Sequence, residues 1–205
     1  RSGSTWSQQA YIKASNSEAN DGFSYSMNLS GYGNTLAVGT PYEDSNAIGI
    51  NGDETNNSAR IAGAAYVFTR TGTTWSQQAY IKASNAENSD AFGVMLSLSA
   101  DGNTLAVGGE GERSNATGVN GDQTNNTAPA SGAVYVLTRS GSSWSQQAYL
   151  KASTTGVEDS FAWPTLSGDG NTLAVGVLGE DSSATGVNGD QTDNSASNAG
   201  AVYIY

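Results

Sequence analysis

The chain has 205 residues, and its 19 acidic against 8 basic side chains give a formal net charge of −11. This charge argues against nucleic acid and anionic membrane surfaces as partners, because like charges repel. Cysteine and histidine are absent, which excludes disulfides, thiolate metal sites and the general base that enzymes use most often.

A repeat of about 69 residues occurs three times in the chain. Two motifs mark each copy, Trp-Ser-Gln-Gln-Ala-Tyr and Gly-Asn-Thr-Leu-Ala-Val-Gly, and they begin at Trp6, Trp75 and Trp144 and at Gly33, Gly102 and Gly170. The spacing predicts three copies of one structural unit, over residues 16–84, 85–153 and 154–205.

The first predicted element is a strand over residues 6–14. Its sequence repeats the fourth strands of the first two copies, which begin at Trp75 and Trp144, but no other strand of its own unit precedes it. We therefore expect residues 1–15 to form an N-terminal fourth strand that completes another unit.

Four strands are predicted in each full copy. In the first copy, apolar and polar residues alternate over residues 23–29, which is typical of a strand with one buried face. A glycine-rich turn leads to a second strand over residues 35–39. After a long loop come a third strand at 64–69 and a fourth at 75–83. The copy at 154–205 contains the first three strands and lacks the fourth.

The predicted fold is all-β, because no segment shows a helical period. Four-stranded antiparallel units in tandem are typical of propeller blades. A single unit cannot bury its apolar faces alone, so neighbouring units are expected to stack. The alternatives are a β-solenoid or a string of small sandwiches.

Two short elements resemble the FG-GAP (integrin-α-like) β-propeller repeat family. The "FG" element corresponds to Asp21-Gly22-Phe23-Ser24 and its counterparts from Asp90 and Asp159, and the "GAP" element to Gly39-Thr40-Pro41. The resemblance implies a propeller with Ca²⁺-binding hairpins and a role in adhesion. Here the corresponding hairpin is shortened to Gly31-Tyr32-Gly33, which offers too few oxygens for Ca²⁺. The family's metal site is therefore not transferred.

The long loop between the second and third strands is rich in acidic and amide side chains. Carboxylate and carbonyl oxygens at short spacing suit Ca²⁺. The candidate ligands are Glu43, Asp44, Asn51, Asp53 and Asn56 in the first copy, Glu110, Glu112, Asn120, Asp122 and Asn125 in the second, and Glu180, Asp181, Asn188, Asp190 and Asp193 in the third. The alternative is that these side chains hold their own loop through hydrogen bonds to its backbone.

Other recurring residues suggest surface roles. The tryptophans at 6, 75 and 144 either pack on the neighbouring unit or stack on a sugar ring. Lys13, Lys82 and Lys151 are interpreted as charges that protect an exposed sheet edge. The loop sequons at Asn56, Asn115 and Asn125 are candidate glycosylation sites. No base, nucleophile and orienting partner occur together, so an enzyme is not expected.

The apolar last strand, at residues 201–205, would be left with an open edge. The segment at residues 6–14 of another copy fits that edge by strand addition. The expected contact residues are Trp6, Ala10, Tyr11 and Ile12 on one side and Ala201, Val202, Tyr203, Ile204 and Tyr205 on the other. Two chains could close a six-bladed ring, and a contact that does not close gives a filament. A longer array of the same repeats is the remaining alternative.

The function predicted from these features is that of an extracellular structural repeat protein. It would associate with itself head to tail, as a fibre, sheath or surface layer. The alternative is an adhesion propeller at the cell surface that binds a glycan or a surface protein through its long loops.

Overall fold

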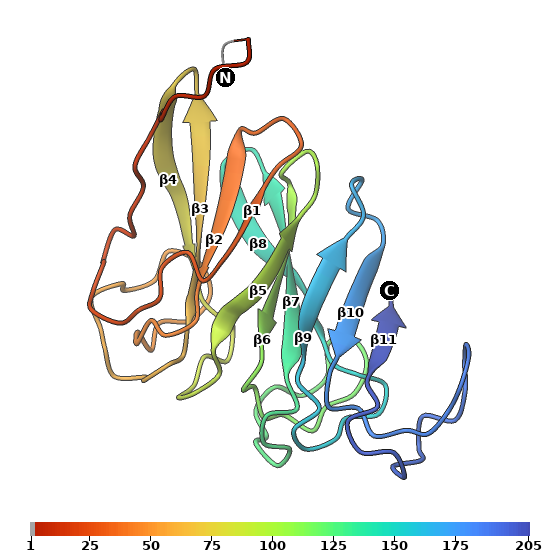
Figure 1. The fold of residues 1–205 in the computed structure, drawn as a ribbon. Coiled ribbons are helices and arrows are strands. Elements are labelled where there is room, and N and C mark those ends of the chain that lie inside the picture. The colour runs from red at the N-terminus through yellow and green to blue at the C-terminus, as the bar shows by residue number, and fades with distance from the viewer. Residues whose placement is uncertain (1–2) are drawn as a thin grey trace.

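The computed structural model describes residues 3–205, and over this range the chain forms antiparallel strands and no helix (Figure 1). The prediction of an all-β fold built from propeller-type blades is confirmed. None of the described residues lies in a helix that could span a membrane. Residues 1 and 2, which belong to the predicted N-terminal strand unit, lie outside the described range.

The strands form three sheets, and each sheet uses residues of one repeat. The first sheet has the order β1 (Ser26–Leu29), β2 (Thr35–Thr40), β3 (Ala64–Thr71) and β4 (Thr74–Ile81). The second has the order β5 (Phe92–Leu98), β6 (Thr104–Gly109), β7 (Ala133–Ser140) and β8 (Ser143–Leu150). The third has only β9 (Phe161–Leu166), β10 (Leu173–Val177) and β11 (Ala201–Ile204).

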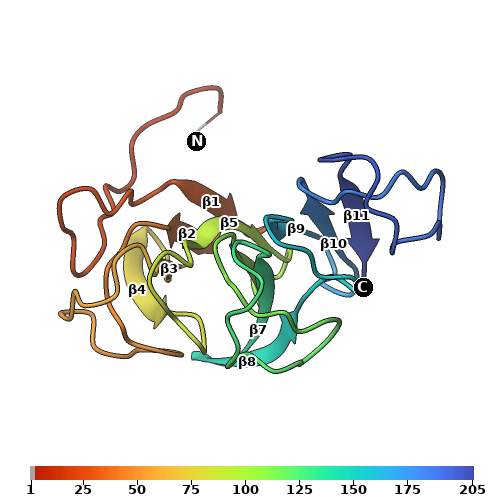
Figure 2. The ribbon, with the colours of Figure 1, turned by 90° about the horizontal axis from the view of Figure 1, so that it is seen from below.

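The sheets stack face to face and fan out around their inner strands (Figure 2). One apolar cluster joins the first sheet to the second, and another joins the second to the third. Glycine permits the close approach at each junction, since a Cβ on Gly39 would lie 2.0 Å from the Gly93 carbonyl oxygen. A Cβ on Gly108 would lie equally close to the Ala162 carbonyl oxygen. These positions cannot accept any side chain without moving a sheet.

The innermost strand of the first sheet is shorter than the alternation of residues predicts. It begins at Ser26 rather than at Phe23. The backbone turns just before it, because the Tyr25 N–H donates to the Gly22 carbonyl and Ser24 has a positive φ of 74°. Local turn geometry therefore overrides the strand pattern over residues 23–25.

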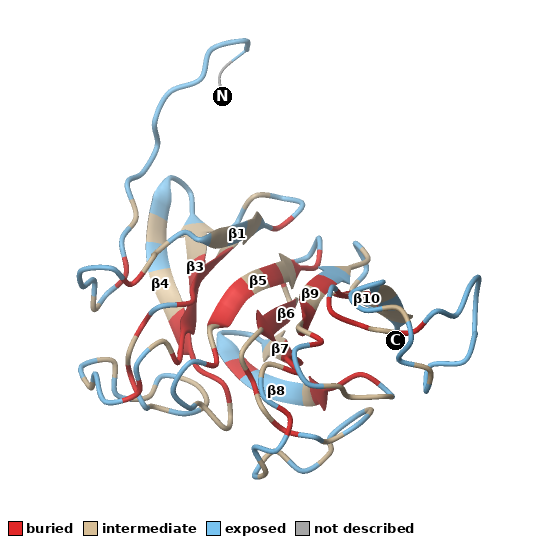
Figure 3. Cartoon of the chain, turned by 60° about the horizontal axis from the view of Figure 1, so that its bottom comes forward, coloured by how far each residue is buried: buried red, intermediate tan, exposed pale blue. Residues whose placement is uncertain are grey.

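The predicted strand at residues 6–14 is not formed. This stretch, called the N-terminal segment below, is an irregular thread that is exposed over most of its length (Figures 1 and 3). A strand needs hydrogen bonds to a neighbour, and the segment pairs with no strand in the described part of the chain. The sequence motif alone does not supply that neighbour.

Candidate self-association surfaces

The predicted cation ligands of the long loops mostly bind their own loop. The Asp53 carboxylate accepts hydrogen bonds from the backbone N–H and the hydroxyl of Thr55 at 2.9 and 2.7 Å. The same turn recurs at Asp122 with Thr124 and at Asp190 with Thr192. These hydrogen bonds lower the pKa of Asp53, Asp122 and Asp190.

Other predicted ligands serve the backbone as well. The carboxylates of Asp44 and Asp181 accept from Ile61 and Asn198 N–H groups, and the Asn51 and Asn120 side chains accept from Tyr80 and Tyr149 N–H groups. Over residues 3–205 no group of three or more acidic side chains is placed to hold a metal ion. The Ca²⁺ prediction for Glu110, Asn188, Asp193 and the rest of the set stays a prediction.

The three candidate glycosylation sites lie in these loops. Asn115 is exposed. Asn56 and Asn125 are half-buried, and their side-chain oxygens accept hydrogen bonds from Ser58 and Thr127, the hydroxyl residues of their own sequons.

Two lysines that were interpreted as edge charges are buried instead. The Lys82 ammonium donates to the Glu43 carboxylate at 2.7 Å, and Lys151 donates to Glu112 at the same distance. All four side chains are at most 2% exposed. Burial lowers the pKa of both lysines, and the facing glutamate opposes that shift. The signal that could have revealed the pairs is that Lys and Glu recur at fixed positions in the repeat.

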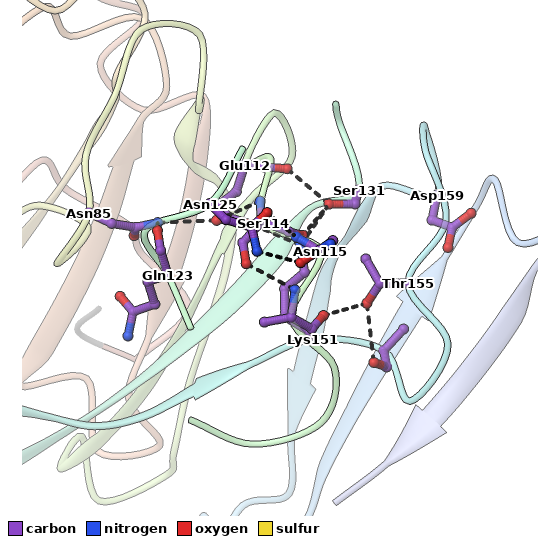
Figure 4. A network of polar contacts seen from close by, with 12 residues as sticks. Asn85, Glu112, Ser114, Asn115, Gln123, Asn125, Ser131, Lys151, Thr155 and Asp159 are labelled. Atoms are coloured by element: carbon purple, nitrogen blue, oxygen red, sulfur yellow. Dashed lines mark hydrogen bonds and ion pairs between the residues drawn. The ribbon is translucent and has the colours of Figure 1, made fainter. Parts of the chain in front are cut away.

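Each buried pair belongs to a polar network within its own repeat, and Figure 4 shows the network around Lys151 and Glu112. The Asn85 amide, from the linker into the second sheet, donates to Glu112 at 3.1 Å and accepts from the Tyr135 hydroxyl at 2.6 Å. Lys151 also donates to the Ser131 hydroxyl at 2.7 Å. Beside the ion pair, the ring of Tyr135 in β7 packs against the ring of Tyr149 in β8, with the ring centroids 5.3 Å apart.

The outer edge of β11 has no partner strand among the described residues. Tyr205 exchanges both backbone hydrogen bonds with Leu173 of β10. Because bonded and open positions alternate along an antiparallel strand, Val202 and Ile204 direct their N–H and C=O groups to the open edge. The predicted contact strand at residues 201–205 is therefore an unpaired edge.

The side chains of Val202 and Ile204 form an exposed surface, called the tail face below. They are 67% and 65% exposed. The equivalent residues of the second sheet, Val134 and Val136, are 0% and 9% exposed because the third sheet covers them.

The opposite end of the array carries a matching head face, formed by Tyr25, Met27 and Leu29 next to and in β1. Met27 and Leu29 are 63% and 54% exposed. Their equivalents in β5, Leu96 and Leu98, are 6% and 7% exposed because they pack against the first sheet. Both ends of the array therefore expose residues that are core inside it.

The N-terminal segment lies against the first sheet as β4 lies against the second. The Gln9 side-chain oxygen accepts from Trp75 Nε1 at 3.1 Å and from Arg70. Gln78 of β4 accepts from Trp144 and Arg139 in the same way. Of the predicted contact residues, Trp6 and Tyr11 are 78% and 81% exposed, so the structure leaves their outer side uncovered.

The repeat is also detected by comparison with protein families. The family model described as FG-GAP repeat matches residues 6–68 and 75–137. No curated protein matches the chain.

Proposed function

The chain belongs to the FG-GAP repeat family, and we propose that it is an extracellular structural protein that associates with itself head to tail. The family is a non-enzymatic repeat domain and is typical of extracellular repeat and adhesion proteins. In the proposed assembly the tail face of one copy packs on the head face of the next, and the chains form a fibre, sheath or surface layer.

The observation that carries this proposal is that the exposed residues of the head and tail faces have equivalents that are buried between neighbouring sheets. Burying one large aliphatic side chain stabilises by about 1.5–3 kcal/mol. The head and tail faces expose several such side chains whose equivalents are buried between sheets. A second copy offers a surface of the right shape, because the internal junctions already join the same two kinds of face.

Strand addition would complete the third sheet. The internal ladders place Ala79 opposite Val67 and Ala148 opposite Val136. By the same register, Ala10 of the incoming N-terminal segment lies opposite Ile204. The added strand would give main-chain hydrogen bonds to the open groups of β11.

Replacing Ala10 by proline tests the proposal. Proline removes the N–H that strand addition needs, while Ala10 is exposed and outside the core clusters. The wild-type chain is expected to show a mass that rises with concentration in sedimentation velocity. Ala10→Pro should remain monomeric, and the control Ala10→Ser, which keeps the N–H, should assemble. A wild-type chain that is monomeric at all concentrations contradicts the proposal.

The mass also separates the forms of assembly. A closed ring of two chains gives a single species of twice the chain mass, whereas a filament gives a broad distribution that grows with concentration. Either result supports head-to-tail association.

A binding role is the second candidate, because the long loops of all three repeats lie at the same edge of the stacked sheets, opposite the short hairpins (Figure 1). An adhesion propeller would present these loops to a glycan or a surface protein. Saturable binding on a glycan array that is lost when the loop at residues 178–200 is replaced supports this role, and an array without any saturable signal excludes the glycan form of it.

A further inference from the structure

In the proposed assembly, the buried carboxylate of Glu180 and the exposed ammonium group of Lys13 each lack an ion-pair partner among the described residues of their own chain. We propose that Glu180 of one copy receives Lys13 of the next copy, so that a buried ion pair between chains fixes the register of strand addition. This inference rests on the proposed head-to-tail association and adds the residues that make it specific.

Glu180 is a carboxylate without its cation. It is only 6% exposed and accepts a hydrogen bond from the Ser182 N–H at 3.2 Å. No lysine or arginine in the described range forms an ion pair with it. A buried carboxylate without a cation beside it is less stable than one in an ion pair. Glu180 also lines a hollow of about 590 Å³ together with Thr154 and Gln191, so there is space beside it.

The other two repeats show what belongs next to this carboxylate. Glu43 accepts from the Ser45 N–H and Glu112 from the Ser114 N–H, as Glu180 does from Ser182. In both cases the second partner is a lysine that directly follows the fourth strand. The third sheet lacks a fourth strand, and its glutamate lacks the lysine.

Lys13 is the matching lysine. Residues 5–16 have the same sequence as residues 74–85, and Lys13 stands where Lys82 stands. Lys13 is exposed and forms no ion pair within residues 3–205, whereas Lys82 is 2% exposed and paired. The lysine and the glutamate of this ion pair are thus both present without each other, at opposite ends of the array, while the same pair forms in the first and second repeats.

The strand register brings the two halves together. Tyr66 lies opposite Tyr80 and Tyr135 opposite Tyr149 in the internal ladders. The same register places Tyr11 of the second copy opposite Tyr203, whose ring now meets only Phe161 among the described aromatic contacts, at 5.8 Å between centroids. Lys13 then follows Ile12 at the end of the added strand, as Lys82 follows Ile81, and reaches the carboxylate of that sheet.

The ion pair also explains why the added strand would not slip. A shift by one residue turns every side chain to the other face. It would place Ile12 beside the buried carboxylate and move the ammonium away from it. Unpaired charge in the wrong register opposes slipped pairings, so the pair selects one register.

Charge reversal tests the pair. Lys13→Glu sets two carboxylates against each other across the interface, and Glu180→Lys sets two ammonium groups against each other. Each single variant is expected to weaken assembly at least tenfold in sedimentation velocity. An equimolar mixture of the two variants should assemble, because every interface between unlike chains then joins opposite charges. Arg60→Glu, which makes the same change of charge at an exposed loop residue, should assemble like the wild type.

Three results overturn the inference. The ion pair is excluded if the single variants assemble with wild-type affinity. It is also excluded if the mixture stays monomeric although circular dichroism shows that both variants are folded. Strand addition itself is tested separately by Ala10→Pro. If Glu180→Lys does not fold, Lys13→Glu mixed with Glu180→Gln replaces it. That mixture is expected to assemble better than Lys13→Glu alone, and equal weakness overturns the pair.

Discussion

Residues 5–16 and 74–85 have one sequence and two structures. The second stretch forms β4, and its Tyr80 is fully buried; in the first stretch no strand forms over residues 6–14, and Tyr11 is 81% exposed. In both stretches, a glutamine side-chain oxygen (Gln9 or Gln78) accepts hydrogen bonds from a tryptophan and an arginine of the sheet that follows. The difference is the neighbour on the other side, because β4 pairs with β3 and the N-terminal segment pairs with no described strand.

This comparison shows that strand formation here depends on pairing more than on intrinsic propensity. A sequence that is β-forming in one place remains irregular in another when no edge is offered. The same holds for burial of charge, since Lys82 is paired inside the array and Lys13 is exposed at its end. In the proposed assembly, the N-terminal segment would take the paired and buried structure that β4 has inside the array.

The largest contrast is expected from removing equivalent lysines. Lys151→Ala leaves Glu112 as a buried charge without its cation, which costs about 3–5 kcal/mol. Lys13→Ala removes an exposed side chain, and surface changes stay within about 0.5 kcal/mol. Urea unfolding of the monomer at low concentration measures both. Equal losses of stability would contradict the difference between interior and end.

A second contrast uses equivalent apolar residues of β5 and β1. Leu96→Ala creates a cavity between the first and second sheets and should cost about 2–5 kcal/mol. Met27→Ala truncates an exposed residue of the head face and should leave the monomer's free energy of unfolding nearly unchanged. The Met27 variant should instead assemble more weakly, which sedimentation at a series of concentrations detects. A stable Leu96→Ala protein would show that the internal junction is not a tight core.

The pH dependence of stability offers a smaller and independent test in the middle repeat. Burial raises the pKa of Asp90 from 3.8 to about 7, against the hydrogen bond that its carboxylate accepts from the Glu87 N–H. Between these values the folded protein holds a proton that the unfolded chain has lost. Stability should therefore fall as the pH rises from about 4 to 7, by up to about 1.4 kcal/mol per pH unit.

Asp90→Asn keeps an oxygen that can accept from the Glu87 N–H and removes the titration. The slope of the free energy of unfolding against pH should flatten in this variant. Asp159, the equivalent residue in the third repeat, also has a pKa raised by burial, so part of the slope should persist. An unchanged slope in Asp90→Asn would rule out Asp90 as its source.

The smallest effect is expected from removing divalent cations. The loop carboxylates already accept hydrogen bonds from their own turns, as Asp53 does from Thr55. The melting temperature should therefore change little when EGTA is added. A large fall in Tm with EGTA, reversed by Ca²⁺, would show instead that the loops depend on bound calcium.

Much of the fold could be predicted from the sequence, because the repeat period and the alternation of residues define each strand pair. The buried ion pairs could not, since a lysine after an outer strand reads as a surface charge until its glutamate partner, 39 residues away in the chain, is placed beside it. The motif of the N-terminal segment predicts a strand because it matches the motif of β4. Whether it pairs depends on a second strand that the motif does not contain.

Amide hydrogen exchange at Val202, Ile204, Ala10 and Ile12, measured at low and high protein concentration, tests whether the N-terminal segment of one copy pairs with β11 of another. Head-to-tail strand addition predicts fast exchange in dilute monomer and strong protection of all four amides in the assembled state. Fast exchange of these amides at every concentration would contradict strand addition. Protection that is already complete in dilute monomer would also contradict it, because the open edge would then be closed within one chain.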